Sequence, residues 1–305
     1  MSASVWPVLF AVFAWWFATG LVLLLDGLPR TTFRWSHLIA SLLAIGALAG
    51  LSHTASQTSE AGAYCAFACA LLLWGWHELS LLTGWVTGPR RVAVDAGASG
   101  WPRFRQALMA ILWHELAILA SVLLLLALTW GAPNQVGSGT FGVLWLMRIS
   151  AKLNVFFGVR NLSTEWLPAH LSYLGSYFRR RRMNAFLPLA VAVASAVAWR
   201  LIVLANGHPT GSAQATGLLL VSTLLVLAIM EHALLVLPIQ VTALWHWAMR
   251  AGHQGGATPQ LRPALHAAPG PEPRLPIALS AGLPSPLPSP LPKAMAADAD
   301  LLHAR

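Results

Sequence analysis

The sequence predicts an all-α membrane protein: a bundle of about seven transmembrane helices with a periplasmic N-terminus and a cytoplasmic C-terminus. The first observation is composition, because 57% of the 305 residues are hydrophobic and only 10% are charged, against about 25% charged residues in a soluble domain. The second is a series of apolar runs close to the roughly 20 residues that span a bilayer. The third is that arginines recur in alternate loops between these runs.

Seven apolar segments are long enough, or nearly long enough, to cross a bilayer. The second and fifth are the shortest, and the fifth contains Arg148 and Lys152, so it is either a functional span or an interfacial helix. The first lacks a basic leader region, so we expect it to remain as a helix. In chain order the expected spans are 5–25, 37–52, 62–84, 105–130, 141–158, 186–206 and 216–237.

The loop charges test this count, because Lys and Arg are enriched in cytoplasmic loops. The loops 52–61, 131–140 and 207–215 contain no Lys or Arg. The arginines that follow the first, third, fifth and seventh spans are, in order, Arg30 and Arg34; Arg90, Arg91 and Arg103; Arg160 and Arg179–Arg182; and Arg250. This alternation is complete only if the fifth segment crosses the membrane, and it predicts the orientation stated above.

Two regions outside the spans have a distinct character. The loop 159–185 contains an amphipathic stretch, Trp166–Phe178, beside the arginine run; aromatic residues next to arginines suit the headgroup region, where the run would act as a topology anchor. After residue 250 the chain is rich in Pro and Ala and cannot bury enough apolar surface to fold alone. We therefore expect a transmembrane helical domain over 1–250 and a disordered cytoplasmic tail over 251–305.

Three pairs of adjacent histidine and glutamate lie inside expected spans. His77–Glu78 and His114–Glu115 each belong to a Trp-His-Glu-Leu string, and Glu231–His232 lies in the seventh span. Ionisable groups in hydrocarbon are costly and usually face a bundle interior or a functional site. The directions of the spans place all three pairs about 9 to 13 Å from the cytoplasmic edge, at 1.5 Å per residue. We therefore expect a shared intramembrane site on the cytoplasmic side.

These residue types suit a metal centre. Imidazole and carboxylate ligands fit iron, zinc or manganese, and a neutral histidine suits the magnesium of a bound chlorin. Neighbours on a helix point about 100° apart, so we expect one residue of each pair to be a direct ligand and the other to support it. The hypothetical metal residues are His77, Glu78, His114, Glu115, Glu231 and His232, and the expected supporting residues are Arg148, Lys152 and Asn154.

Other interpretations of the same residues stay open. One is a tetrapyrrole or quinone pocket, and another is a structural network of Glu–His and Glu–Lys contacts that fixes helix packing. Lys152 could instead extend to the headgroups. The spacing is neither the Glu-x-x-His of soluble di-iron bundles nor His-Glu-x-x-His. The sequence contains no Gly-rich phosphate loop, nucleophile elbow or Cys-x-x-Cys, so it identifies no catalytic residue.

The stretch Lys152–Phe178, together with the two Trp-His-Glu-Leu strings and Glu231–His232, resembles the PuhE-type photosynthetic complex assembly protein family of purple phototrophic bacteria. The resemblance extends over residues 1–250 and excludes the Pro-rich tail. It implies a multi-pass protein of the bacterial inner membrane, cytoplasmic or intracytoplasmic, in an organism that contains bacteriochlorophyll. The family is associated with reaction-centre assembly and with bacteriochlorophyll levels, and the resemblance carries over no catalytic residue.

These observations favour an integral inner-membrane factor for assembly of the bacterial photosynthetic reaction centre or for control of bacteriochlorophyll supply. The alternative is a membrane-embedded metal-dependent enzyme with a His/carboxylate centre, acting in pigment biosynthesis or oxygen chemistry. The expected partners are the lipid bilayer and either reaction-centre subunits or pigment-synthesis enzymes. Nucleic acid is not expected, because the basic residues gather in short loops and form no soluble basic face. A transporter is less favoured, because no internal repeat is evident.

Overall fold

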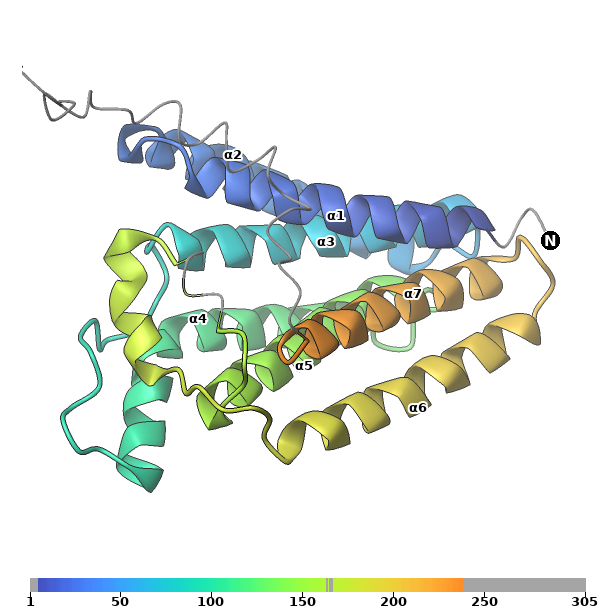
Figure 1. The fold of residues 1–305 in the computed structure, drawn as a ribbon. Coiled ribbons are helices and arrows are strands. Elements are labelled where there is room, and N and C mark those ends of the chain that lie inside the picture. The colour runs from blue at the N-terminus through green and yellow to red at the C-terminus, as the bar shows by residue number, and fades with distance from the viewer. Residues whose placement is uncertain (1–4, 163, 165–166, 238–305) are drawn as a thin grey trace, which may run out of the picture. The chain divides into compact units, whose positions relative to one another are not determined.

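The computed structural model describes residues 5–162, 164 and 167–237, and within them seven long helices follow one another (Figure 1). All seven are long and apolar enough to cross a membrane, which confirms the expected number of spans, the second and fifth included. The side of the membrane on which each terminus lies stays a prediction, and the tail 251–305 falls outside the described residues. The helices are α1 (Val5–Asp26), α2 (Phe33–Ala55), α3 (Glu60–Leu82), α4 (Gly100–Thr129), α5 (Val136–Phe157), α6 (Phe186–Asn206) and α7 (Ala213–Leu234).

The two helices expected to be short are longer than the hydropathy indicated. α2 begins at Phe33 because a 3₁₀ turn, Arg30–Thr32, leads directly into it. α5 begins at Val136, within a Gly-rich stretch expected as loop. There Asn134 accepts a hydrogen bond from the N–H of Val136 and donates one to the carbonyl oxygen of Thr54, so it binds the first N–H of α5 and ties this helix to the end of α2. Tertiary contacts therefore override the low helix propensity of glycine.

The core of the bundle lies between α3 and α7, the two most deeply buried helices. α3 contacts α1, α2, α4, α5 and α7, and its buried alanines, Ala63, Ala66 and Ala70, let neighbouring backbones approach closely, as in membrane bundles generally. Phe67 of α3 packs with Leu220 and Leu224 of α7. The outer faces of the other helices are apolar and exposed, as lipid contact requires.

α4 bends where the loop after α3 inserts its backbone against the helix. The N–H of His114 donates to the carbonyl oxygen of Thr87 at 2.9 Å, and the N–H of Arg90 donates to that of Met109 at 3.3 Å. In a regular helix, the N–H of His114 would bond to Ala110, so the insertion interrupts the helical ladder, a recognised cause of kinks. Figure 1 shows α4 changing direction in its N-terminal part. This elbow brings His114 close to the end of the bundle despite the length of α4.

The loop between α5 and α6 folds back onto the bundle. Its helical part is a 3₁₀ helix, η3 (Ala169–Tyr177), in place of the amphipathic stretch expected over 166–178, whose Trp166 lies outside the described residues. Leu171, Leu174 and Tyr177 recur every third residue, the period of a 3₁₀ helix, and pack against Ala110 of α4. The same segment thus covers the outside of the α4 elbow.

His170 joins this loop to the end of α3. Its Nε2–H donates to the carbonyl oxygen of Leu82 at 2.8 Å. Partial burial and the nearby Arg30 hold the pKa of His170 below its ordinary value, while the Leu82 bond acts in the opposite direction. The neutral form of the imidazole is therefore favoured. Because protonation is disfavoured in the folded state, the contribution of His170 to stability is present above about pH 6.5 and declines as the pH falls below it.

Asn184 joins the end of α5 to the start of α6. Its buried side chain donates to the carbonyl oxygens of Asn154 at 3.2 Å and Gly158 at 2.9 Å, and accepts from the N–H of Leu187 at 3.0 Å. Asn184→Ala is expected to cost about 2 kcal/mol, because buried backbone groups lose their partners. The measurement is thermal unfolding of the purified protein in detergent. Asn206→Ala, at an exposed helix end, is the control and should change the midpoint little; equal shifts for both variants would contradict the assignment.

Candidate intramembrane polar site

Two cations one turn apart on α5 bind carboxylates from two other helices. Arg148 Nη2 lies 2.7 Å from Glu78 Oε2 of α3, and Lys152 Nζ lies 2.5 Å from Glu115 Oε1 of α4. We call these four residues the charge network. Its formal charges sum to zero, and it connects α3, α4 and α5 within the apolar bundle. The two glutamate side chains and Lys152 are mostly shielded, at 14%, 18% and 24% exposure, so each charge depends on its partner for compensation.

The two histidines of the Trp-His-Glu-Leu strings lie beside the charge network, facing each other. The rings of His77 and His114 have centroids 6.4 Å apart and stand nearly perpendicular. His77 Nε2 lies 2.9 Å from Ser121 Oγ, whereas neither ring nitrogen of His114 has a hydrogen-bond partner among the described residues. His114 is 0% exposed, so a ring the size of a chlorin would have to displace packed helices to reach it.

The third pair is divided between the interior and the surface of α7. His232 is buried; its Nδ1–H donates to the carbonyl oxygen of Ala228 at 2.8 Å, so its Nε2 accepts from the hydroxyl of Ser150 at 2.9 Å. Glu231 is exposed and accepts a hydrogen bond from Trp15 of α1. The histidine of this pair therefore contacts α5, as do the glutamates of the other two pairs.

Asn154 also lies on α5, one turn beyond Ser150. It is fully buried, and its amide donates to the carbonyl oxygen of Ser150 at 2.9 Å. Its backbone carbonyl accepts the bond from Asn184 described above. The three residues expected to support the site are thus all on α5, but Asn154 stabilises the helix and its junction with α6, whereas Arg148 and Lys152 neutralise carboxylates.

Of the interpretations that the sequence left open, these contacts favour a structural network of polar side chains between helices. The carboxylates of Glu78 and Glu115 are bound by cations. Glu231 accepts from Trp15 and lies within electrostatic reach of Arg148 and Glu78. Within the described part of the chain, no group of three or more His, Cys, Asp or Glu side chains is placed to hold a metal ion.

Sequence reasoning did not find the serine partners of the histidines. Ser121 lies seven residues after His114, on the same face of α4, and Ser150 lies between Arg148 and Lys152. The spacing of Ser121 was a usable signal, because seven residues make almost two helical turns. The Ser150–His232 contact was not predictable, since it depends on how α5 and α7 are rotated against each other.

The fold and this site define a polytopic membrane protein whose spans are connected by partly buried ion pairs and by histidine–hydroxyl contacts. The chain belongs to the family described as protein of unknown function (DUF3623), whose model matches residues 1–255. It is similar to a protein of Rhodobacter capsulatus named "Uncharacterized 30.4 kDa protein in puhA 5'region", with 34% identity over 249 residues that cover 78% of this chain and 88% of the relative. No solved structure is significantly similar to the chain.

Proposed function

We propose that this protein is a membrane factor that supports assembly of the photosynthetic reaction centre or the supply of bacteriochlorophyll to it. The observation that carries the proposal is the Rhodobacter relative, whose name places it in the puhA 5' region. The similarity extends over most of both chains, which supports a shared role. The resemblance to the PuhE-type family, stated above on Lys152–Phe178 and the His–Glu pairs, points the same way.

The arrangement of the helices is compatible with a scaffold that presents its outer surface to membrane partners. The charge network and the histidine contacts lie inside the bundle, between α3, α4, α5 and α7. The outer helices expose large apolar side chains, for example Leu42 and Ile45 of α2 and Leu189 of α6. Such faces can contact either lipid or the spans of a partner, for which we propose reaction-centre subunits or pigment-synthesis enzymes. The bacterial inner membrane, with the C-terminus in the cytoplasm, is the corresponding location.

Deletion of the gene in its phototrophic host tests this proposal. We expect the reaction-centre absorbance of isolated membranes to fall severalfold, while growth without light stays unchanged, and a plasmid copy of the full chain should restore it. If total bacteriochlorophyll falls in parallel, the protein acts in pigment supply. If reaction centres fall while pigment or its precursors persist, it acts in assembly. Unchanged reaction-centre and pigment levels would overturn the proposal.

The metal-dependent enzyme remains the second candidate from sequence, but no contact in the described residues favours it over the scaffold. Metal analysis of the purified full chain distinguishes the two: stoichiometric iron, zinc or manganese that is lost in both His77→Ala and His114→Ala would favour the enzyme.

A further inference from the structure

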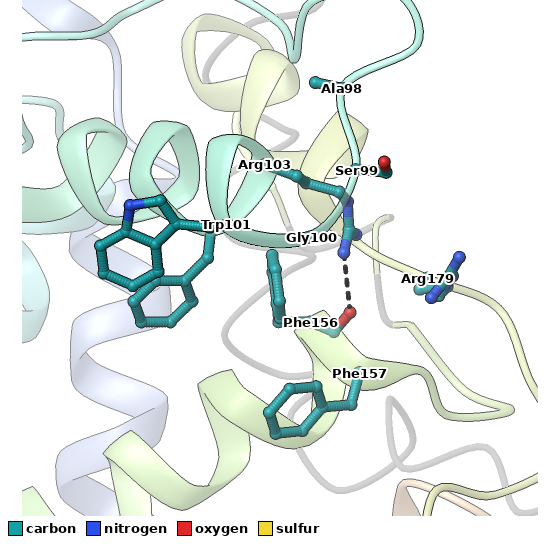
Figure 2. A pocket seen from close by; sticks show the side chains of 9 residues that line it. Ala98, Ser99, Gly100, Trp101, Arg103, Phe156, Phe157 and Arg179 are labelled. Carbon is teal, nitrogen blue, oxygen red and sulfur yellow. Dashed lines mark hydrogen bonds between the residues drawn. The ribbon is translucent and has the colours of Figure 1, made fainter.

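A pocket of about 610 Å³ opens between the first turn of α4 and the last turn of α5 (Figure 2). Trp101 of α4 and Phe156 and Phe157 of α5 line it, and Arg103 and Arg179 contribute its charged groups. It lies at the arginine-rich end of the bundle, where the loops after α3 and α5 meet, and more than one turn of α5 beyond Lys152. It is therefore separate from the charge network and was not foreseen from the sequence.

Among the described residues, the guanidinium of Arg103 is held in place by uncharged partners. It donates to the carbonyl oxygen of Phe156 at 3.3 Å and to that of Tyr177 at 2.6 Å, and it lies 4.1 Å from the centre of the Phe156 ring. Figure 2 shows the bond to Phe156 at the edge of the pocket. A guanidinium has five N–H donors, so three remain for a ligand. The partners are uncharged, so the full positive charge of Arg103 remains.

Arg179 adds a second positive charge that has no ion pair among the described residues, and its backbone is fixed. Its N–H donates to the carbonyl oxygen of Val155 and its own carbonyl accepts from Val159, both at 3.1 Å, while the residue is exposed. The ion pairs found in the described residues are Arg90–Asp95, Arg148–Glu78 and Lys152–Glu115, and none of their carboxylates lines the pocket. Two arginines at one cavity without an acid favour an anionic ligand.

We propose that this pocket binds the phosphate of an anionic phospholipid, with Arg103 and Arg179 contacting the phosphate oxygens and the aromatic rings contacting the glycerol and the upper acyl chain. The position favours a lipid, because the pocket is at the ends of two spans, where the headgroups lie. Trp101 is 71% exposed, as expected for an aromatic side chain in the headgroup region. Anionic lipid is also what arginines at a membrane surface attract. This inference is independent of the proposed function.

Native mass spectrometry of the purified full chain in detergent tests the site, with added phosphatidylglycerol and, separately, phosphatidylcholine of the same acyl chains. We expect preferential binding of one phosphatidylglycerol per chain. Arg179→Gln should weaken this binding about fivefold and Arg103→Gln about tenfold, in line with loss of a charge-assisted contact. Arg182→Gln removes an equal charge from the same arginine run but does not line the pocket, so it should change binding less than twofold.

Three outcomes would overturn the proposal. Equal loss in Arg182→Gln and Arg179→Gln would indicate diffuse attraction to the arginine run. Equal binding of the two lipids would show that the headgroup charge is not recognised. Binding of inorganic phosphate that depends on both arginines, without competition from phosphatidylglycerol, would assign the pocket to a soluble anion. Arg103 also donates to two backbone carbonyls, so Arg103→Gln could prevent folding. In that case Arg179→Gln decides the test, because the Arg179 side chain is exposed.

Discussion

Lys152→Met is expected to destabilise the bundle by about 3 kcal/mol, because it leaves the carboxylate of Glu115 without its cation in an apolar surrounding. Glu115→Gln should have a similar cost, since it leaves the ammonium of Lys152 unpaired. The cost is limited to a few kcal/mol because a buried group can change its protonation state when its partner is lost. The measurement is the thermal midpoint of the purified protein in detergent, together with the amount of folded protein recovered.

The double variant Lys152→Met/Glu115→Gln gives the contrast that isolates the ion pair. Replacing both charges removes the uncompensated group, so the double variant should recover most of the stability lost by either single variant. Arg148→Met and Glu78→Gln should show the same pattern, because their ion pair also lies within the spans. Losses that simply add in the double variant would show that Lys152 and Glu115 do not depend on each other, contrary to their 2.5 Å contact.

Gly88→Ala is expected to prevent the loop after α3 from inserting at the elbow of α4. A Cβ atom at this position would lie 2.1 Å from the carbonyl oxygen of Met109 and 2.6 Å from the carbonyl carbon of Ala110. Both atoms belong to the helix backbone, so no side-chain rotation relieves the overlap. The bonds between Thr87 and His114 and between Arg90 and Met109 would be lost together. We expect a loss of more than about 3 kcal/mol, at the upper end for single substitutions.

Gly142→Ala is the matched control, because a Cβ atom on this glycine of α5 meets nothing within 4 Å. Alanine also has the higher helix propensity, so this variant should be as stable as the parent or slightly more stable. Hydrogen exchange provides a second measurement. Protection of the His114 backbone amide should fall in Gly88→Ala and stay unchanged in Gly142→Ala. A Gly88→Ala protein with a normal midpoint and a protected His114 amide would refute the elbow contact.

The depth of His114 in the membrane stays a prediction, whereas the predicted start of its helix was wrong. Sequence reasoning started the fourth span at residue 105 and counted nine residues to His114; the helix in fact begins at Gly100, fourteen residues before it. The bend shortens the distance along the bundle, so His114 still meets His77, which lies five residues before the end of α3. A backbone insertion of this kind leaves no periodic trace in the sequence and could not have been predicted.

The sequence by itself determined the number and order of the spans and the location of the His–Glu pairs, Arg148 and Lys152 within them. Composition, apolar length and the alternation of loop arginines are properties of local segments, and the bilayer acts on each segment separately. Only the tertiary structure decided which charge pairs with which. Arg148 binds Glu78, Lys152 binds Glu115 and Ser150 binds His232 because of the rotation of α5 against α3, α4 and α7. That rotation results from the packing of small residues at several interfaces at once, and no single segment encodes it.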